Sequence, residues 1–149
     1  MEIEIQRASE APGQPTDGQL TAWAMVTPLA GMDAAELVIR IVDEAESREL
    51  NHQFRGKDRP TNVLSFPFGA PPGFPCHHLG DLAICAPVVA SEALEQGKPS
   101  EAHWAHMVVH GVLHLLGHDH QNDAEAEAME ALEVEILARL GFPDPYEEH

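Results

Sequence analysis

The strongest constraint on the fold is the way strand-type and helix-type patterns divide between the two halves of the chain. The first half holds short β-branched or alternating segments typical of strands, at 2–6, 36–43, 61–66 and 79–85. The second half holds longer segments of helical periodicity, at 87–96, 100–116 and 123–140, after shorter helix candidates at 20–29 and 44–51. This order predicts an α+β fold, in which a mixed four-stranded sheet packs with about five helices.

Length and composition favour one domain spanning residues 1–149. The chain is 44% hydrophobic, which is ordinary for a globular protein, and no apolar stretch approaches the ~20 residues of a membrane span. The N-terminus lacks the basic and apolar parts of a secretion signal. With only Cys76 and Cys85, no disulfide framework is indicated, and we expect a cytoplasmic protein.

The charge is strongly acidic, with 8 Lys and Arg against 25 Asp and Glu, a net charge of −17. Such a chain repels polyanions over most of its surface. Four of its cations nevertheless fall within twelve residues, at Arg48, Arg55, Lys57 and Arg59. This basic segment is either a solvated loop or a local anion-binding site, and composition alone does not separate the two.

Histidines are concentrated in one segment, because six of the ten lie between His103 and His120. His110 and His114 are one helical turn apart and therefore project from one face, close enough to chelate a single cation. Gly117 allows the chain to leave the helix and bring His120 to a third ligand position. Three imidazoles and one open position are typical of a catalytic zinc site, here at the end of a central helix.

The remaining histidines have weaker assignments. His118 is a spare ligand or a flank of the cleft, His106 is an outer contact of the site or touches substrate, and His103 is expected in solvent. The Cys76-His77-His78 group is expected to be incidental.

The last predicted helix is expected to be amphipathic. Its core face is formed by the apolar residues Met129, Leu132, Ile136, Leu137 and Leu140. Its solvated face is expected to carry the acidic residues Glu125, Glu127, Glu130, Glu133 and Glu135.

The residue after the first ligand bears on the reaction class. The spacing from His110 to His120 is that of the metzincin zinc proteases, and zinc proteases place their general base directly after the first histidine. Here that position is Gly111, which has no side chain. A peptidase would need a general base from another part of the chain. A substrate whose reaction does not need a general base at this position is therefore favoured.

The motif His110-Gly111-x-Leu113-His114-Leu115-x-Gly117-x-Asp119-His120 resembles the signature of the YbeY family of bacterial endoribonucleases. The segment from Leu50 to Pro67 is similar to a second block of that family, and Leu79-Gly80-Asp81-Leu82 resembles a third. The resemblance runs from about Asp43 to Tyr146. His118 departs from the pattern, since many members carry Tyr there.

The resemblance implies a metal-dependent, single-strand-specific endoribonuclease that acts in 16S rRNA 3′-end maturation and 70S ribosome quality control. It implies one Zn²⁺ per chain on His110, His114 and His120, and an important arginine at Arg55. Its partners would be single-stranded ribosomal RNA and the small ribosomal subunit or associated proteins, without DNA or membranes.

The site residues predicted from both arguments fall into two groups. The catalytic group is Arg55, His110 and His114, and the substrate-binding group is Arg55, Lys57, Arg59, Ser65 and Asp81. Arginine suits phosphate because its planar guanidinium offers two parallel donors. Two alternatives stay open: a zinc hydrolase of peptides or small molecules, and a non-catalytic ribosome assembly factor whose metal is structural.

Overall fold

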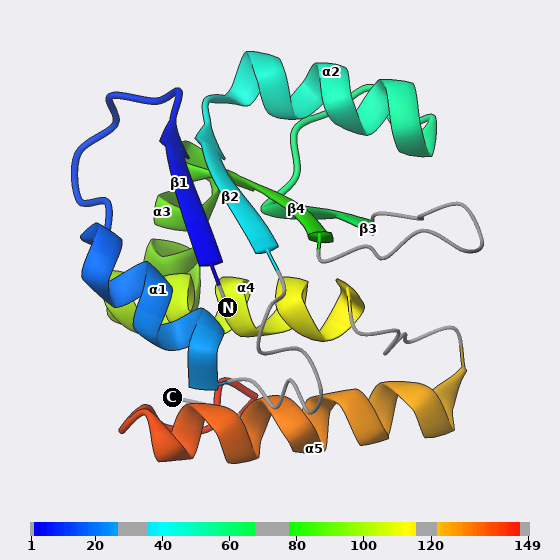
Figure 1. Cartoon of the computed structure of the whole chain (residues 1–149). Helices are drawn as coiled ribbons and strands as arrows, with labels where there is room; N and C mark the ends of the chain where they lie inside the picture. Colours follow the sequence, from blue (N-terminus) through cyan, green and yellow to red (C-terminus); the bar gives the residue numbers. More distant parts are fainter. Residues whose placement is uncertain (1, 27–35, 68–77, 116–121, 147–149) are drawn as a thin grey trace.

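The computed structural model describes residues 2–26, 36–67, 78–115 and 122–146. Within these residues the chain has an α+β fold, with four strands in one mixed sheet and five helices (Figure 1). The predicted fold class is therefore confirmed.

The sheet has the order β1-β2-β4-β3. Its strands are β1 (Glu2–Arg7), β2 (Glu36–Val42), β3 (Val63–Pro67) and β4 (His78–Cys85). The pairs β1–β2 and β2–β4 are parallel, whereas β3 runs antiparallel to β4 and forms an edge of the sheet. All four strands lie within two residues of their predicted bounds.

The helices form layers on both faces of the sheet (Figure 1). One face is covered by α4 (Ser100–Leu115), and α5 (Asp123–Arg139) packs against the far side of α4. The helix α2 (Glu44–Arg55) lies on the opposite face. The helices α1 (Asp17–Val26) and α3 (Ala86–Gln96) also pack against α4. This central helix is thus enclosed on most sides, which makes it a rigid support for the histidines.

Burial of α4 explains its composition. Eleven of its sixteen residues are buried, including Trp104 and Leu113. A helix that is apolar around most of its circumference must lie in the interior. Ile39 of β2 and Leu82 of β4, which pair in register, belong to the same core cluster.

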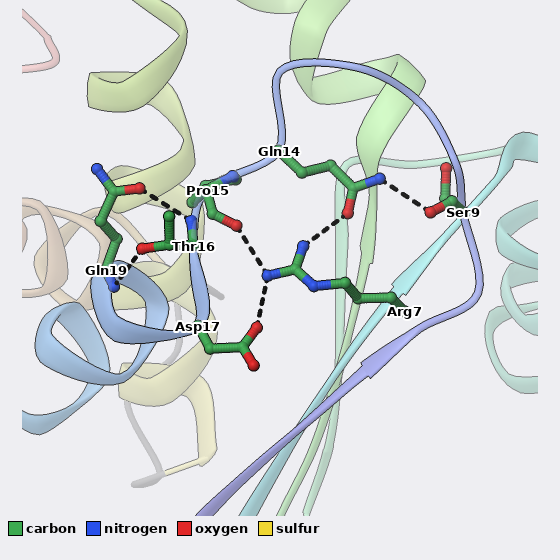
Figure 2. A network of polar contacts seen from close by, with 7 residues as sticks. All are labelled: Arg7, Ser9, Gln14, Pro15, Thr16, Asp17 and Gln19. Carbon is green, nitrogen blue, oxygen red and sulfur yellow. Dashed lines mark hydrogen bonds and ion pairs between the residues drawn. The ribbon is translucent and has the colours of Figure 1, made fainter.

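The connection between β1 and α1 is held by polar contacts (Figure 2). The guanidinium of Arg7 donates to the Pro15 carbonyl at 2.9 Å and to the Asp17 carboxylate at 2.6 Å. Thr16 and Gln19 cap the helix reciprocally, because each side chain accepts a bond from the other's backbone N–H. This capping box explains why α1 starts at Asp17, three residues before the predicted start.

The helix α2 is longer than the sequence predicts. The polar pattern predicts an end near Asn51, but the helix continues to Arg55 and ends where Gly56 adopts a left-handed conformation with φ of 70°. The Gly56 N–H donates to the His52 carbonyl at 3.1 Å, which satisfies an orphan group of the last turn. Arg55 is therefore helical and does not belong to a basic loop.

Candidate metal centre

His110 and His114 lie side by side in the last turns of α4. Their ring centroids are 4.8 Å apart, with an angle of 64° between the planes. Both residues are half-buried, in contrast to the buried residues on either side of them. The sequence prediction that these two rings share one face of a helix is confirmed.

Gly111 lies at a close approach of α4 to the sheet. A Cβ atom at this position would lie 2.7 Å from Cδ2 and 3.0 Å from Cδ1 of Leu82. The Ser65 hydroxyl of β3 also donates to the Gly111 carbonyl at 3.2 Å. Position 111 therefore faces the sheet with no room for a side chain, which explains why a protease-type general base is absent there.

The carboxylate of Glu133 on α5 is the polar centre of the site. Its Oε1 accepts a hydrogen bond from His110 Nδ1 at 2.7 Å. Its Oε2 lies 2.5 Å from His106 Nε2 and accepts a bond from the Tyr146 hydroxyl at 2.5 Å. One buried carboxylate thus joins α4, α5 and the segment that follows α5.

The prediction that Glu133 lies on the solvated face of the last helix is wrong. Glu133 is 0% exposed, whereas the other four acidic residues of that group are partly or fully exposed. The signal lay in the spacing: Glu133 is four residues after Met129 and three before Ile136, two residues of the buried stripe. A carboxylate within an apolar stripe needs buried donors, and His106 and His110 provide them.

These contacts fix the protonation of the carboxylate and the phenol. Burial alone raises the pKa of Glu133, but the hydrogen bonds from His106 and His110 outweigh it and bring the pKa to about 2. For Tyr146, burial and then the bond to Glu133 raise the pKa above its ordinary value. At neutral pH the carboxylate is charged and the phenol remains a donor.

The bond to Glu133 also selects the tautomer of His110. A proton on Nδ1, donated to the carboxylate, puts the lone pair on Nε2, which is the usual outer arrangement behind a metal-binding histidine. The described residues contain one group of possible ligands, His106, His110 and Glu133, with ligand atoms within 4.8 Å of one another. This cluster can hold a metal ion.

The distances within the cluster are those of hydrogen bonds. Two ligands of a tetrahedral zinc ion lie about 3.3 Å apart, given bonds of about 2.0–2.2 Å to the ion. The contacts of Glu133 with His106 and His110 are shorter, at 2.5 and 2.7 Å. The contacts as they stand are therefore hydrogen bonds, with the Glu133 carboxylate at Nδ1 of His110 and at Nε2 of His106.

The two histidines of α4 that precede His110, His103 and His106, are buried. His103, which we expected in solvent, is only 3% exposed because α3 and α5 cover the flanks of α4, so that prediction is wrong. Burial lowers its pKa, and its Nε2 lies 2.9 Å from the Glu92 carboxylate on α3. His106 contacts Glu133, as one of the two predicted alternatives requires.

Several predicted residues lie outside the described part of the chain. They include the third ligand His120, together with His118 and the glycine of the predicted turn, Gly117. Cys76 and His77 lie outside it as well.

Some cations form ion pairs within the described part of the chain and others do not. Four of the eight Lys and Arg side chains form ion pairs with carboxylates, namely Arg7, Arg40, Arg48 and Arg139. Arg55, Lys57 and Arg59 are exposed and form no ion pair with any residue that the structure describes. These three residues are termed here the basic end of α2: Arg55 is the last residue of α2, and Lys57 and Arg59 follow it. The helix α2 lies on the face of the sheet opposite α4 (Figure 1).

Ser65 and Asp81 lie on opposite faces of the sheet. Ser65 pairs with Leu82 and faces α4, where its hydroxyl contacts Gly111. Asp81 pairs with Phe66 and is exposed on the side of α2. The structure thus brings His110 and His114 together, and it separates them from the basic end of α2 and from Asp81.

The fold and this cluster define a class: an α+β protein with a histidine and carboxylate centre able to hold a metal ion. The YbeY endoribonuclease family matches residues 19–141, most of the chain. The chain therefore belongs to the YbeY family, and this membership supports a role as an endoribonuclease in rRNA processing.

One solved relative has the same fold. The solution structure of the Thermotoga maritima protein TM1509 is 26% identical in sequence, with a TM-score of 0.55. The alignment covers 96% of this chain and 99% of that protein. Among the described residues, no helix has the length and apolar character needed to cross a membrane.

Proposed function

We propose that this chain is a zinc-dependent, single-strand-specific endoribonuclease that acts in the cytoplasm in 16S rRNA 3′-end maturation and 70S ribosome quality control. Family membership supports the RNA-cleaving activity. The observation that carries the metal dependence is the hydrogen bond between His110 Nδ1 and the buried Glu133 carboxylate. A carboxylate that accepts from the other ring nitrogen is a common arrangement behind a metal-binding histidine.

The proposed zinc ligands are His110, His114 and His120. The first two are already adjacent on α4, with ring centroids 4.8 Å apart. The third comes from the segment after α4, as the motif implies. In this arrangement Glu133, a buried residue of α5, keeps the proton on Nδ1 of His110 and fixes the orientation of the ring.

The proposed reaction is cleavage of an RNA phosphodiester bond. Zinc, when bound, supplies a Lewis acid and lowers the pKa of a coordinated water toward about 7. Arg55 holds a phosphate of the RNA strand through its guanidinium, on the face of the sheet opposite His110 and His114 (Figure 1). Lys57 and Arg59 add phosphate contacts, and Ser65 and Asp81 remain proposed substrate contacts from the two faces of the sheet.

Electrostatics favour delivery of the RNA by a partner. The net charge of −17 opposes the binding of long RNA over most of the surface. The exposed cations at the basic end of α2 form a local exception. We propose that the small ribosomal subunit or an associated protein presents the RNA end, so that a few phosphate contacts suffice.

The test is cleavage of a labelled single-stranded RNA, combined with measurement of bound zinc. We expect His114→Ala to lose both zinc and cleavage. We expect Arg55→Ala to keep zinc and to lower kcat/KM about 10- to 150-fold through weaker RNA binding, the range for loss of a hydrogen bond to a charged group. Arg139→Ala, which removes an exposed arginine on α5, is the control and should cleave normally.

Three results would contradict the proposal. One is zinc-loaded protein that leaves single-stranded RNA intact. Another is cleavage of casein or a peptide library in its place, which would indicate a zinc peptidase. The third is a His114→Ala variant that loses its fold together with its zinc, which would indicate a structural metal.

A further inference from the structure

A groove lies between α2 and the sheet. It has a volume of about 450 Å³. Its apolar walls include Leu50 and Phe54 of α2 and Val38 and Phe66 of the sheet. Ligand pockets typically span about 300–1,000 Å³ and combine apolar walls with a few fixed polar groups.

The polar groups of this groove are held in place. Arg40 donates to both carboxylate oxygens of Glu46, at 2.5 and 3.0 Å, and to the Gln6 side chain at 3.2 Å. Asp81 stands beside them on the exposed face of β4. The groove thus offers both acceptors and donors at its wall, which the edge of a nucleobase requires.

Phe54 is an aromatic ring placed in solvent. The residue is 60% exposed, and its ring meets Phe66 edge to face, with centroids 4.9 Å apart. Phe66 in turn is half-buried in the groove. Exposed aromatic rings beside cations are typical of surfaces that bind single-stranded nucleic acid, because every base presents a π face for stacking.

The cations follow Phe54 closely in the sequence. Phe54 and Arg55 are consecutive in the last turn of α2, and Gly56 then turns the chain so that Lys57 and Arg59 follow. All three cations lack an ion pair with any described residue, although the chain is acidic almost everywhere else. The lining of the groove itself carries Arg40 against Glu46 and Asp81. The three cations therefore favour phosphates beside the groove, and the aromatic pair favours a flat ring within it.

We propose that this groove takes up one unstacked base of single-stranded RNA, with Phe54 as the stacking residue and the basic end of α2 on the adjoining phosphates. This inference rests on the proposed function and deepens it by locating where the strand is held. A base in a duplex is stacked and paired and does not enter such a groove. The groove therefore accounts for single-strand specificity on the face of the sheet opposite the metal centre.

The test measures binding by the full-length protein, with fluorescence anisotropy of a labelled single-stranded 2′-O-methyl oligoribonucleotide shown to stay intact on a gel. An abasic oligomer of equal length reports backbone contacts alone. Phe54→Ala should weaken binding of the base-bearing oligomer about 5- to 150-fold, the range for loss of one stacked base. It should leave binding of the abasic oligomer unchanged.

Three further variants separate the contributions. Phe54→Leu keeps apolar volume without the ring, so it should weaken binding nearly as much as Phe54→Ala, and it guards against loss of fold. Arg55→Ala should weaken both oligomers and reduce the salt slope by about 0.7. Leu94→Ala removes another exposed apolar side chain, 86% exposed on α3, and should bind as wild type.

Two outcomes would contradict the proposal that the groove binds a base. Wild-type affinity in both Phe54 variants would mean that the groove takes another occupant, such as a protein segment. An equal loss for the base-bearing and abasic oligomers would mean that no base is bound there. Failure of the proposed function looks different, because the protein would then bind the oligomer with the predicted Phe54 dependence yet cleave no RNA with zinc bound.

Discussion

Replacement of Glu133 by glutamine tests the structural link between α5 and the metal centre. The change keeps the size of the side chain and removes its charge. In the wild type, the two carboxylate oxygens accept bonds from His110, His106 and Tyr146. An amide supplies one oxygen and one NH₂ group, so at least one of these donors meets another donor.

The magnitude follows from the hydrogen bonds that the substitution weakens or removes. A hydrogen bond to a charged group contributes about 1.5–3 kcal/mol, against about 0.5–1.5 kcal/mol for a neutral one. Removing the partner that orients a metal-binding histidine weakens metal binding about 10- to 100-fold, which is about 1.4–2.7 kcal/mol. We therefore expect the zinc Kd of Glu133→Gln to rise about 10- to 100-fold and the free energy of unfolding to fall by about 1–3 kcal/mol.

The assay is competition for zinc against a chromophoric chelator, with urea unfolding of the same samples. Glu135→Gln is the matched control, since it makes the same change two residues away at an exposed ion pair with Arg139. Surface pairs of this kind contribute about 0–1 kcal/mol, so zinc affinity should not change. If Glu133→Gln bound zinc as tightly as Glu135→Gln, Glu133 would not orient a metal ligand.

Three further substitutions have defined outcomes. Gly111→Ala forces a Cβ to within 2.7 Å of Leu82 and should lower the free energy of unfolding in urea by about 1–3 kcal/mol. Asn122→Ala removes the side chain that accepts from the Glu125 N–H at the start of α5, and should cost about 0.5–2 kcal/mol in the same assay. Tyr146→Phe removes one donor to Glu133 and should cost about 1 kcal/mol, since water can reach the half-buried site, without changing the wavelength maximum of tryptophan fluorescence. Stability equal to wild type in any of these would contradict the hydrogen bond or close approach concerned.

Local sequence patterns predict the fold because each element carries its own signal. The strands follow from β-branched runs, and the helix α3 follows from Pro87 in its first turn and Gly97 at its end. The end of α2 is harder to place, because its last turn is polar and ends only at Gly56. A polar last turn shows little apolar periodicity, so the sequence pattern does not mark where this helix ends.

The site is predictable only in part, because two of its features depend on tertiary packing. The pair His110 and His114 follows from helical spacing alone. The burial of Glu133 depends on which helix packs against α5, and charged residues on a long acidic helix are usually solvated. The solvent position expected for His103 is wrong for the same reason, since its burial depends on α3 and α5 covering α4.

The most direct test of the account is X-ray absorption at the zinc edge of the loaded protein and of two variants. Three imidazole nitrogens at about 2.0–2.1 Å with one further light ligand are expected, with one imidazole lost in His120→Ala and the count unchanged in Glu133→Gln. A shell of two imidazoles and a carboxylate that is unaffected by His120→Ala but altered by Glu133→Gln would place the ion between His106, His110 and Glu133, and would contradict the three-histidine site.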